Sequence, residues 1–379
     1  MTRQSVPQSV TFAYDGLTVR VDAHERTALA WLTEFLTPAF SVVNADTVDC
    51  CIEMIADDRV YHDILARGQR ISRRFKGFML DRGTVDLPVW AETPSERILY
   101  DRACRAFYCV GADRARVRLL STAHHLPARF ALMRVVREFA MNAAQSSRRL
   151  LIHGAAFATS AGGFILAGTK AAGKTSLLIH ALRSSGARFV TNDRVLVAFD
   201  GTQPMLRGMP TVVTIRPTTL ALFSDLRTRL LDSGYDHRLS LGEGAPSGSP
   251  TAPPKADRPI DLSPAQFCEW LSVKMSDASP LRAIFFPTVT TAHAEIRLRK
   301  LSPHAASERI ERARFGPVAC GSQSEVFTAP ASSPAVPAGV RVSLSILAAS
   351  VPCFECELGP RAYERGVAFT DLINRALPS

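Results

Sequence analysis

Apolar and polar residues alternate over short stretches in the first part of the chain, a pattern typical of half-buried β-strands. Other stretches there carry apolar residues three and four positions apart, which predicts amphipathic helices. The alternating stretches are residues 10–23, 47–57 and 105–121, and the helical ones are residues 24–36 and 128–144. The dipeptide Asp15-Gly16 divides the first alternating stretch and predicts a hairpin turn. Residues 1–147 are therefore expected to form an N-terminal α+β accessory domain.

The pattern changes at residue 148, after which nearly continuous apolar runs alternate with glycines and one strong helix. Runs of this kind predict strands that are buried on both faces, as in a sheet flanked by helices. The expected strands are residues 150–158, 163–167, 187–193, 283–289 and 294–301, and the helix is residues 176–186. The sequence thus predicts an α/β domain over residues 148–379. Two stretches rich in Gly, Pro or Ser, near residues 242–259 and 321–340, are expected to be flexible loops of this domain.

Length and charge narrow the functional classes. A chain of 379 residues exceeds the usual size of one domain, and its formal charge of +10 favours an anionic partner such as a nucleotide or an acidic peptide. No run approaches the ~20 apolar residues of a membrane-spanning helix, and the first residues lack the apolar core of a secretory signal. These features predict a cytoplasmic protein with no membrane partner. Nucleic acid is not an expected partner, because the basic cluster within residues 67–76 has only Phe75 as a stacking platform.

The eight cysteines include one Cys-x-x-Cys pair, Cys353 and Cys356. A lone pair is half of a zinc site, and apolar and polar residues alternate around it as they do on a strand. Cys353 and Cys356 are therefore expected to be strand residues rather than metal ligands.

The strongest chemical signal is the phosphate-binding motif GxxxxGK[ST], which residues 168–175 match at every position. Its residues are Gly168, Thr169, Lys170, Ala171, Ala172, Gly173, Lys174 and Thr175, and Ser176 follows as a further nucleotide contact. The glycines let backbone N–H groups surround phosphate oxygens, Lys174 supplies a cation, and the Thr175 hydroxyl is placed to ligate Mg²⁺. An apolar run precedes the motif and a helix follows it, so a phosphate would meet the positive end of a helix. We therefore expect ATP and Mg²⁺ as cofactors.

Two titratable residues are candidates for catalysis beside this P-loop. Asp193 ends the apolar run 187–193, which as a parallel neighbour strand would bring its carboxylate next to the P-loop as a metal ligand or as a base. The alternative is an aspartate that only opens a turn. His153 stands at the carboxyl end of the run before Gly154, where a histidine with a structural hydrogen bond is the alternative to a catalytic one.

The order of these pieces resembles the catalytic domain of the bacterial HPr kinase/phosphorylase family. The resemblance rests on His153-Gly154, on the P-loop, and on the strand that closes on Asn192-Asp193. The dipeptide Arg207-Gly208 also looks like the Arg-Gly of the family signature. The resemblance covers residues 153–208 well and the region to the C-terminus more loosely, whereas residues 1–147 do not match.

This resemblance implies a P-loop fold akin to that of phosphoenolpyruvate carboxykinase, and ATP-dependent phosphorylation of a serine hydroxyl on a small protein or peptide. Carried over by position, Lys174 and Thr175 would bind phosphate and Mg²⁺, and His153 would stand close to the transferred phosphoryl group. Asn192 and Arg207 would be substrate or phosphate contacts. The expected catalytic residues are Asp193, His153 and Lys174, and the expected metal ligands are Thr175 and Asp193.

Two positions depart from the family pattern. Asn192 stands where the first aspartate of the family's Asp-Asp pair is expected, and Met205 replaces an acidic residue two positions before Arg207. Since an amide cannot accept a hydroxyl proton at neutral pH, the base would be Asp193, His153 or a residue that the sequence does not reveal. The leading interpretation is a serine kinase. A small-metabolite kinase and a non-catalytic ATP-binding regulatory or assembly protein stay open, as does assembly into a homo-oligomer.

Overall fold

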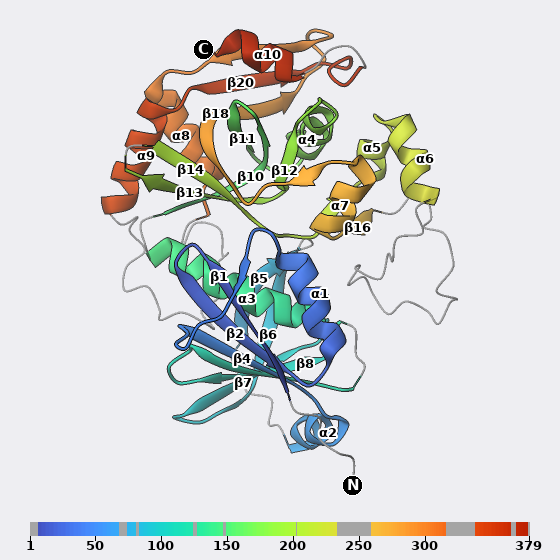
Figure 1. Cartoon of the computed structure of the whole chain (residues 1–379), viewed down its shortest axis with the longest axis vertical. Coiled ribbons are helices and arrows are strands. Elements are labelled where there is room, and N and C mark those ends of the chain that lie inside the picture. The colour runs from blue at the N-terminus through green and yellow to red at the C-terminus, as the bar shows by residue number, and fades with distance from the viewer. Residues whose placement is uncertain are drawn as a thin grey trace. The chain divides into compact units, whose positions relative to one another are not determined.

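The computed structural model describes residues 7–67, 74–80, 83–123, 127–146, 149–201, 203–232, 259–315, 338–364 and 369–377 of the chain. The described residues up to 146 belong to one compact unit, and those from 149 onward belong to a second. Both units are mixed α/β structures (Figure 1). The loops expected near residues 242–259 and 321–340 lie almost wholly outside the described residues. Among the described helices, none combines the length and the apolar character needed to cross a membrane.

The first unit contains one large mixed sheet. Its strands are β1 Gln8–Tyr14, β2 Leu17–Ala23, β3 Ser41–Val43, β4 Cys50–Ala56, β5 Arg74–Leu80, β6 Gly83–Glu92, β7 Glu96–Asp101, β8 Ala106–Gly111 and β9 Arg116–Ser121. Their order across the sheet is β3-β1-β2-β4-β9-β8-β7-β6-β5. Its helices are α1 Arg26–Leu36, α2 Asp58–Arg67 and α3 Ala128–Ser146. The hairpin at Asp15-Gly16 and the helices α1 and α3 confirm what the hydrophobic pattern predicts.

Helix α3 buries charged residues as well as apolar ones. The spacing of its apolar residues predicts a polar, solvated face, yet Arg134 is only 3% exposed. Its guanidinium donates to Asp101 Oδ2 at 2.5 Å and to the Tyr108 hydroxyl at 2.9 Å. Burial works to raise the pKa of Asp101, but Arg134 and the Cys104 N–H outweigh it and hold that pKa below its ordinary value. The Arg134 charge is therefore paired with Asp101 inside the unit rather than solvated.

The second unit is built on another nine-stranded sheet, with helices on both faces. Its strands are β10 Leu150–Thr159, β11 Gly162–Ala167, β12 Arg188–Thr191, β13 Arg194–Asp200, β14 Gln203–Met209, β17 Lys274–Met275, β18 Ala278–Val289, β19 Ile296–Lys300 and β20 Cys353–Leu358. The order is β17-β12-β10-β13-β14-β18-β20-β19, and β11 pairs with both β10 and β18. A separate pair joins β15 Val213–Ile215 to β16 Ile260–Leu262. The helices are α4 Lys174–Leu182, α5 Pro217–Leu220, α6 Ser224–Asp232, α7 Pro264–Leu271, α8 Pro303–Ala313, α9 Ala338–Ser350 and α10 Phe369–Ala376.

Strand β11 is buried on both faces because each face meets its own apolar core. Phe164 and Leu166 pack with residues of α4 and α10, whereas Ile165 and Ala167 pack with residues of α8 and α9. Helices α8 and α9 accordingly lie on one side of the strands and α4 on the other (Figure 1). The strand before the P-loop is thus held rigidly, as its continuous apolar run predicts.

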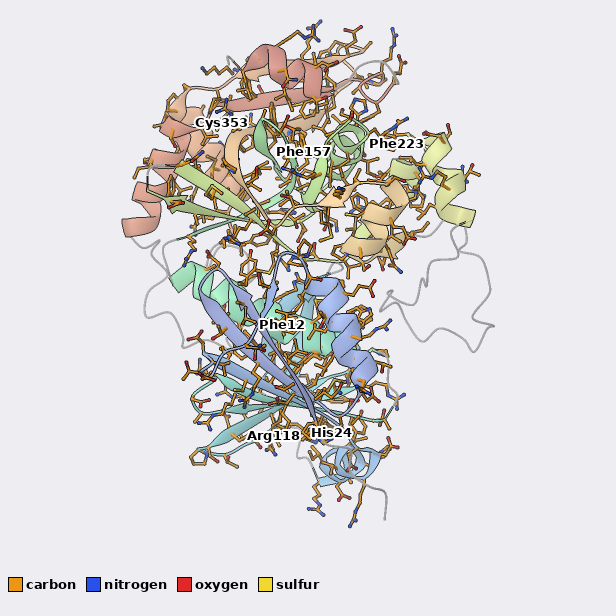
Figure 2. All side chains as sticks on the ribbon, viewed as in Figure 1. Phe12, His24, Arg118, Phe157, Phe223 and Cys353 are labelled. Atoms are coloured by element: carbon orange, nitrogen blue, oxygen red, sulfur yellow. The ribbon has the colours of Figure 1, made fainter. Side chains whose placement is uncertain are left out.

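The Cys-x-x-Cys pair is part of these cores and forms no metal site. Cys353 belongs to the α8–α9 core and Cys356 to the α4–α10 core, so the two thiols lie on opposite faces of β20. Figure 2 shows Cys353, and also Phe157, which packs in the α4–α10 core. Burial raises the pKa of each thiol to about 12. The prediction that both cysteines are strand residues is confirmed.

Two element boundaries differ from the sequence-based expectation. Helix α4 ends at Leu182 rather than near Gly186, because Arg183 and Ser184 turn more tightly and donate to the carbonyls of His180 and Ala181. His153 lies within β10 and not at the carboxyl end of a strand. The strand continues past Gly154 because the next residues pair with β11 as a hairpin.

Candidate phosphate-binding site

The P-loop leads from the end of β11 into the start of α4. Gly168, Ala171 and Gly173 all have positive φ, at 150°, 68° and 95°. A Cβ on Gly173 would lie 2.9 Å from Leu358 Cδ1, so both the backbone conformation and the packing require glycine there. Ala171 carries a side chain in the left-handed region, a strained conformation that is often found where a loop is shaped around a ligand. The backbone therefore has the curl that the motif predicts.

Helix α4 begins at Lys174 with Gly173 as its N-cap and no side-chain cap. The first N–H groups of a helix have no partner within the helix, and its dipole places partial positive charge at that end. A phosphate at the P-loop would therefore meet both hydrogen-bond donors and a favourable field.

Lys174 is buried at the centre of this site. Its ammonium group donates to the carbonyl oxygens of Gly168 and Thr169, each at 2.8 Å. Burial lowers its pKa to about 8; Asp193 opposes this shift, and Arg216 adds to it. Asp193 and Arg216 thus both lie close enough to Lys174 to act on its charge.

Asp193 and His153 form a pair beside the P-loop. His153 Nε2 lies 3.3 Å from Asp193 Oδ1, and Arg194 Nε lies 3.5 Å from the other carboxylate oxygen. The rings of His153 and Phe315 are 5.5 Å apart, and the Arg194 guanidinium lies 5.4 Å from the Phe315 ring centre. The Gly154 N–H donates to the Asp193 carbonyl at 2.9 Å, which fixes the backbone of the aspartate against β10. An acid–base pair is therefore held at the edge of the phosphate site.

The route by which Asp193 reaches the P-loop differs from the expectation. The sequence predicts that β12 is the direct neighbour of the P-loop strand, but β10 pairs with β11 on one side and with β12 on the other. Both pairings are antiparallel, so β12 runs parallel to β11 with one strand between them. This arrangement is why His153, which is on β10, and Asp193, which follows β12, come together.

The structure places Asn192 by side-chain hydrogen bonds and Arg207 by its position on a strand. Asn192 Oδ1 accepts a hydrogen bond from the Thr211 hydroxyl at 2.6 Å, and its Nδ2 donates to the Val212 carbonyl at 3.3 Å. The amide thus ties the chain after β14 to the end of β12. Arg207 lies on β14 opposite Leu196, and this register does not by itself bring its guanidinium to the P-loop. A substrate contact by either residue stays a prediction.

Arg216 is a site residue that sequence reasoning missed. It precedes α5, its side chain is exposed, and it makes no ion pair with the described residues. Its charge nevertheless acts on Lys174, so a second cation lies within electrostatic range of the phosphate site. In the sequence, Arg216 is marked only by its position before Pro217, and an arginine before a proline is too common to indicate a site.

Comparison with known proteins assigns no family. No model of a known protein family matches the sequence, and no curated protein matches it either. The geometry of the P-loop and its neighbours is therefore the basis for assigning a function.

The residues at hand fit a magnesium ion that is shared with a nucleotide. Mg²⁺ usually keeps several waters and binds through one or two carboxylates together with substrate phosphates. The half-buried Thr175 hydroxyl and the partly exposed Asp193 carboxylate are donors of this kind. Within the described residues, no cluster of three or more His, Cys, Asp or Glu side chains is placed to hold a metal without a substrate.

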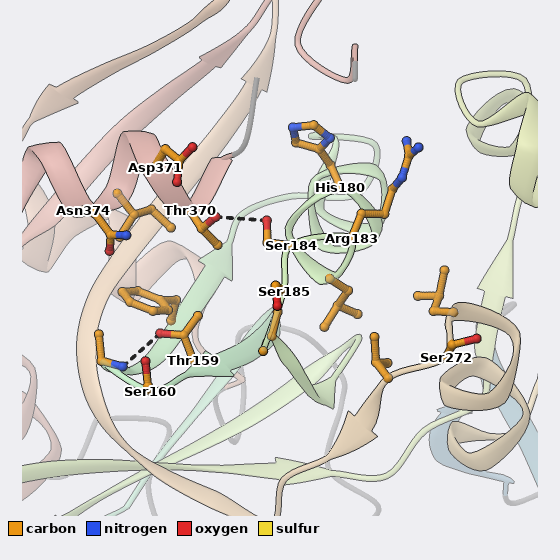
Figure 3. A pocket seen from close by; sticks show the side chains of 18 of the residues that line it. Thr159, Ser160, His180, Arg183, Ser184, Ser185, Ser272, Thr370, Asp371 and Asn374 are labelled. Carbon is orange, nitrogen blue, oxygen red and sulfur yellow. Dashed lines mark hydrogen bonds between the residues drawn. The ribbon is translucent and has the colours of Figure 1, made fainter. Parts of the chain in front are cut away.

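A cavity of about 890 Å³ lies at the opposite end of α4 (Figure 3). Arg183, Ser184, Thr370 and Asp371 are among the residues that line it, and the Thr370 hydroxyl donates to Ser184 Oγ at 2.9 Å. Its described lining includes none of the P-loop residues, nor His153 or Asp193. The phosphate site is therefore identified by its backbone and charges and not by this cavity.

Proposed function

We propose that this protein is an ATP- and Mg²⁺-dependent kinase of the HPr serine kinase type, which transfers the γ-phosphoryl group to a serine hydroxyl of a small protein or peptide. The observation that supports this best is the carboxylate–imidazole pair of Asp193 and His153, 3.3 Å apart, beside a P-loop that holds Lys174. A P-loop alone supports nucleotide binding, whereas a P-loop with an acid–base pair next to it supports transfer to a hydroxyl.

The binding of the triphosphate falls to the P-loop and to the two cations. Backbone N–H groups between Gly168 and Gly173 surround phosphate oxygens, and the Lys174 ammonium group exchanges its carbonyl partners for the β and γ phosphates. Arg216 adds a second positive charge without the burial of Lys174. Because these groups are already in place, they stabilise the negative charge on the transferring phosphoryl group with little reorganisation.

The transfer step uses the pair of Asp193 and His153. The acceptor oxygen forms a bond to the γ phosphorus as the bond from that phosphorus to the β,γ-bridging oxygen breaks, and ADP leaves with the bridging oxygen. The hydroxyl proton passes to Asp193 Oδ1, where His153 Nε2 at 3.3 Å orients the carboxylate and shares the proton. When bound through Thr175 and the nucleotide phosphates, Mg²⁺ would neutralise phosphate charge. In the alternative arrangement Asp193 would be a ligand of Mg²⁺, and His153 would take the hydroxyl proton.

The serine on a small protein or peptide, and the phosphoenolpyruvate-carboxykinase-like form of the fold, follow from the sequence resemblance. Helices on both faces of a mixed sheet, with a P-loop between β11 and α4, are compatible with such a fold. The net charge of +10 also favours an acidic acceptor.

The test is phosphoryl transfer from ATP labelled at the γ position, with Mg²⁺ and the short proteins encoded beside this chain as acceptors. Wild type is compared with Lys174→Ala and Asp193→Asn, and with Asp200→Asn as a matched control, because Asp200 is an exposed aspartate at the far end of β13. The kinase proposal predicts label on a peptide serine that both site variants abolish and the control keeps.

Other outcomes point to the other two functions. Label on a low-molecular-weight hydroxyl compound, and on no peptide, would make the protein a small-metabolite kinase. Tight MgATP binding without transfer to any acceptor would favour an ATP-binding regulatory or assembly protein, for which Asn192 in place of an acidic residue is the supporting observation.

A further inference from the structure

The two flanks of the P-loop differ in chemistry. On the β10 flank stand His153 and Asp193, and the Asp193 charge acts on Lys174. On the other flank, β18 runs parallel to β11, with Leu166 opposite Phe285. Strand β18 continues to Val289, four residues further, so its end extends beyond the end of β11 and alongside the P-loop.

Val289 and Tyr363 contact the P-loop on this second flank. A Cβ placed on Gly173 would lie 3.3 Å from Val289 Cγ2 and 3.4 Å from the Tyr363 hydroxyl. Val289 is 60% exposed, because the last two residues of β18 extend beyond the buried part of the strand. Tyr363 is partly buried, and burial raises the pKa of its hydroxyl to about 12. An uncovered apolar surface thus adjoins the phosphate site.

The surface around Val289 is held in place by the end of β20. The Thr290 N–H donates to the Leu358 carbonyl at 3.0 Å, and the Arg361 N–H donates to the Ala294 carbonyl at 2.8 Å. The His293 ring lies 2.8 Å from Glu357 Oε2 through Nε2, and 2.8 Å from the Glu295 carbonyl through Nδ1. The segment that follows β18 is therefore fixed by several hydrogen bonds and presents Val289 in one position.

We propose that the exposed face of Val289, with Tyr363 beside it, is the subsite for the nucleoside base of the phosphoryl donor. This inference rests on the proposed function. A P-loop lysine reaches the β and γ phosphates, and the acid–base pair has to face the γ phosphate. The triphosphate then runs from Asp193 across the P-loop, and its nucleoside end arrives at the opposite flank, at Val289.

The chemistry of this subsite also sets its selectivity. An aliphatic side chain offers contact area to the face of any base but no donor or acceptor for its edge. Apolar contacts discriminate weakly between ligands of similar shape. Strong discrimination against an analogue comes from hydrogen bonds that the analogue cannot make. The subsite is therefore expected to bind purine and pyrimidine triphosphates with similar affinity.

The test compares two ligands by calorimetry, MgATP and magnesium tripolyphosphate, which has the phosphate chain without the nucleoside. The variants are Val289→Asn, which removes apolar contact without adding charge, and Val289→Trp, which adds a stacking surface. Ile346→Asn is the control, because Ile346 is also an exposed aliphatic residue, at 48%, and lies on α9, which packs against the other core.

Val289→Asn is expected to weaken MgATP binding by about 3- to 10-fold, and Val289→Trp to strengthen it by about fivefold or more. Both should leave tripolyphosphate affinity unchanged, and Ile346→Asn should change neither ligand. Wild-type affinities for ATP, GTP and CTP should lie within about tenfold of one another. The inference is overturned if neither Val289 variant changes MgATP affinity, or if both ligands change equally. If wild type binds neither ligand, the phosphate site itself is wrong and the proposed function fails with it.

Discussion

His153 Nε2 and Asp193 Oδ1 lie 3.3 Å apart, although the P-loop and all of α4 separate the two residues in the chain. The pair exists because β10 is inserted between β11 and β12, so that its middle residues face the end of β12. A histidine within a strand and an aspartate at the end of a strand have ordinary structural roles when taken singly. Together, beside Lys174, the histidine and the aspartate are the residue types of a site that transfers a proton.

Replacement of Asp193 by Asn should lower the rate of phosphoryl transfer by about 10²- to 10⁴-fold, the usual contribution of a general base. An amide keeps the shape of the side chain but cannot take the hydroxyl proton. His153→Gln should cost less, because the carboxylate remains. Single-turnover rates with saturating MgATP check this, with Asp200→Asn as the control. Full activity of Asp193→Asn would remove the aspartate from the mechanism.

Lys174 should take up a proton when nucleotide binds near pH 8. Its pKa in the free protein is about 8, so roughly half of the molecules carry a neutral lysine at that pH. Bound phosphate favours the charged form, and the uptake should be about half a proton at pH 8 and close to none at pH 6. Calorimetry in buffers of different ionisation enthalpy measures it.

The same shift sets the sign of a stability effect. The pKa of Lys174 in the folded protein lies below its ordinary value of 10.5, so the unfolded chain binds the lysine proton more tightly. Without ligand, the contribution of Lys174 to the free energy of unfolding therefore rises between pH 8 and pH 10.5. Lys174→Arg, which stays charged, should show neither the uptake nor this rise. Wild-type proton uptake that does not change between pH 6 and pH 8 would contradict the assignment.

Asn192→Asp should destabilise the protein and should not restore activity. The side chain donates to the Val212 carbonyl at 3.3 Å, which a carboxylate cannot do. The loss is expected to be about 1–3 kcal/mol in the free energy of unfolding. Urea unfolding and the transfer assay check it, with the exposed Asn374→Asp as the control. A variant that is as stable as wild type and more active would show that Asn192 replaces a lost catalytic acid.

Asp101→Asn should destabilise the first unit by about 3–5 kcal/mol, because it leaves the buried Arg134 guanidinium without its counter-charge. The pKa of Asp101 in the folded chain lies below its ordinary value of 3.8. Its stabilising contribution is therefore complete above pH 3.8 and is lost as the pH falls through the lower folded value. Hydrogen exchange of the α3 amides measures the effect, and the exposed Asp63→Asn is the control. Equal exchange rates of the α3 amides in the Asp101→Asn and Asp63→Asn variants would contradict the predicted destabilisation.

The elements around the P-loop could be predicted because their signals are local. The apolar run of β11, the glycines of the loop and the spacing of α4 are contiguous in the sequence, and so are the hairpin at Asp15-Gly16 and helix α3. Each of these elements is predicted by residues that are neighbours in the sequence and by whether one or both of its faces are apolar.

The other features of the fold and of the site depend on contacts between segments that are far apart in the sequence. Local patterns of residues do not encode such contacts. The position of β10 between β11 and β12 is a property of the whole sheet, and it is why the neighbour-strand prediction for Asp193 is wrong. The effect of the Arg216 charge on Lys174 joins two residues that are far apart in the chain. The burial of Arg134 needs Asp101 at the end of β7, so the helical spacing of α3, which predicts a solvated face, could not reveal it.

The most direct test of the phosphate site is the affinity for MgATP of wild type and of Lys174→Ala, measured by calorimetry at pH 7. Wild type is expected to bind with a Kd between about 1 μM and 1 mM, the range of typical enzyme substrates. Removal of the charged lysine should weaken binding by about 10- to 100-fold, because charge-assisted contacts to phosphate contribute about 1.5–3 kcal/mol each. Equal affinity of the two proteins, or no binding by wild type, would contradict a phosphate site at this loop.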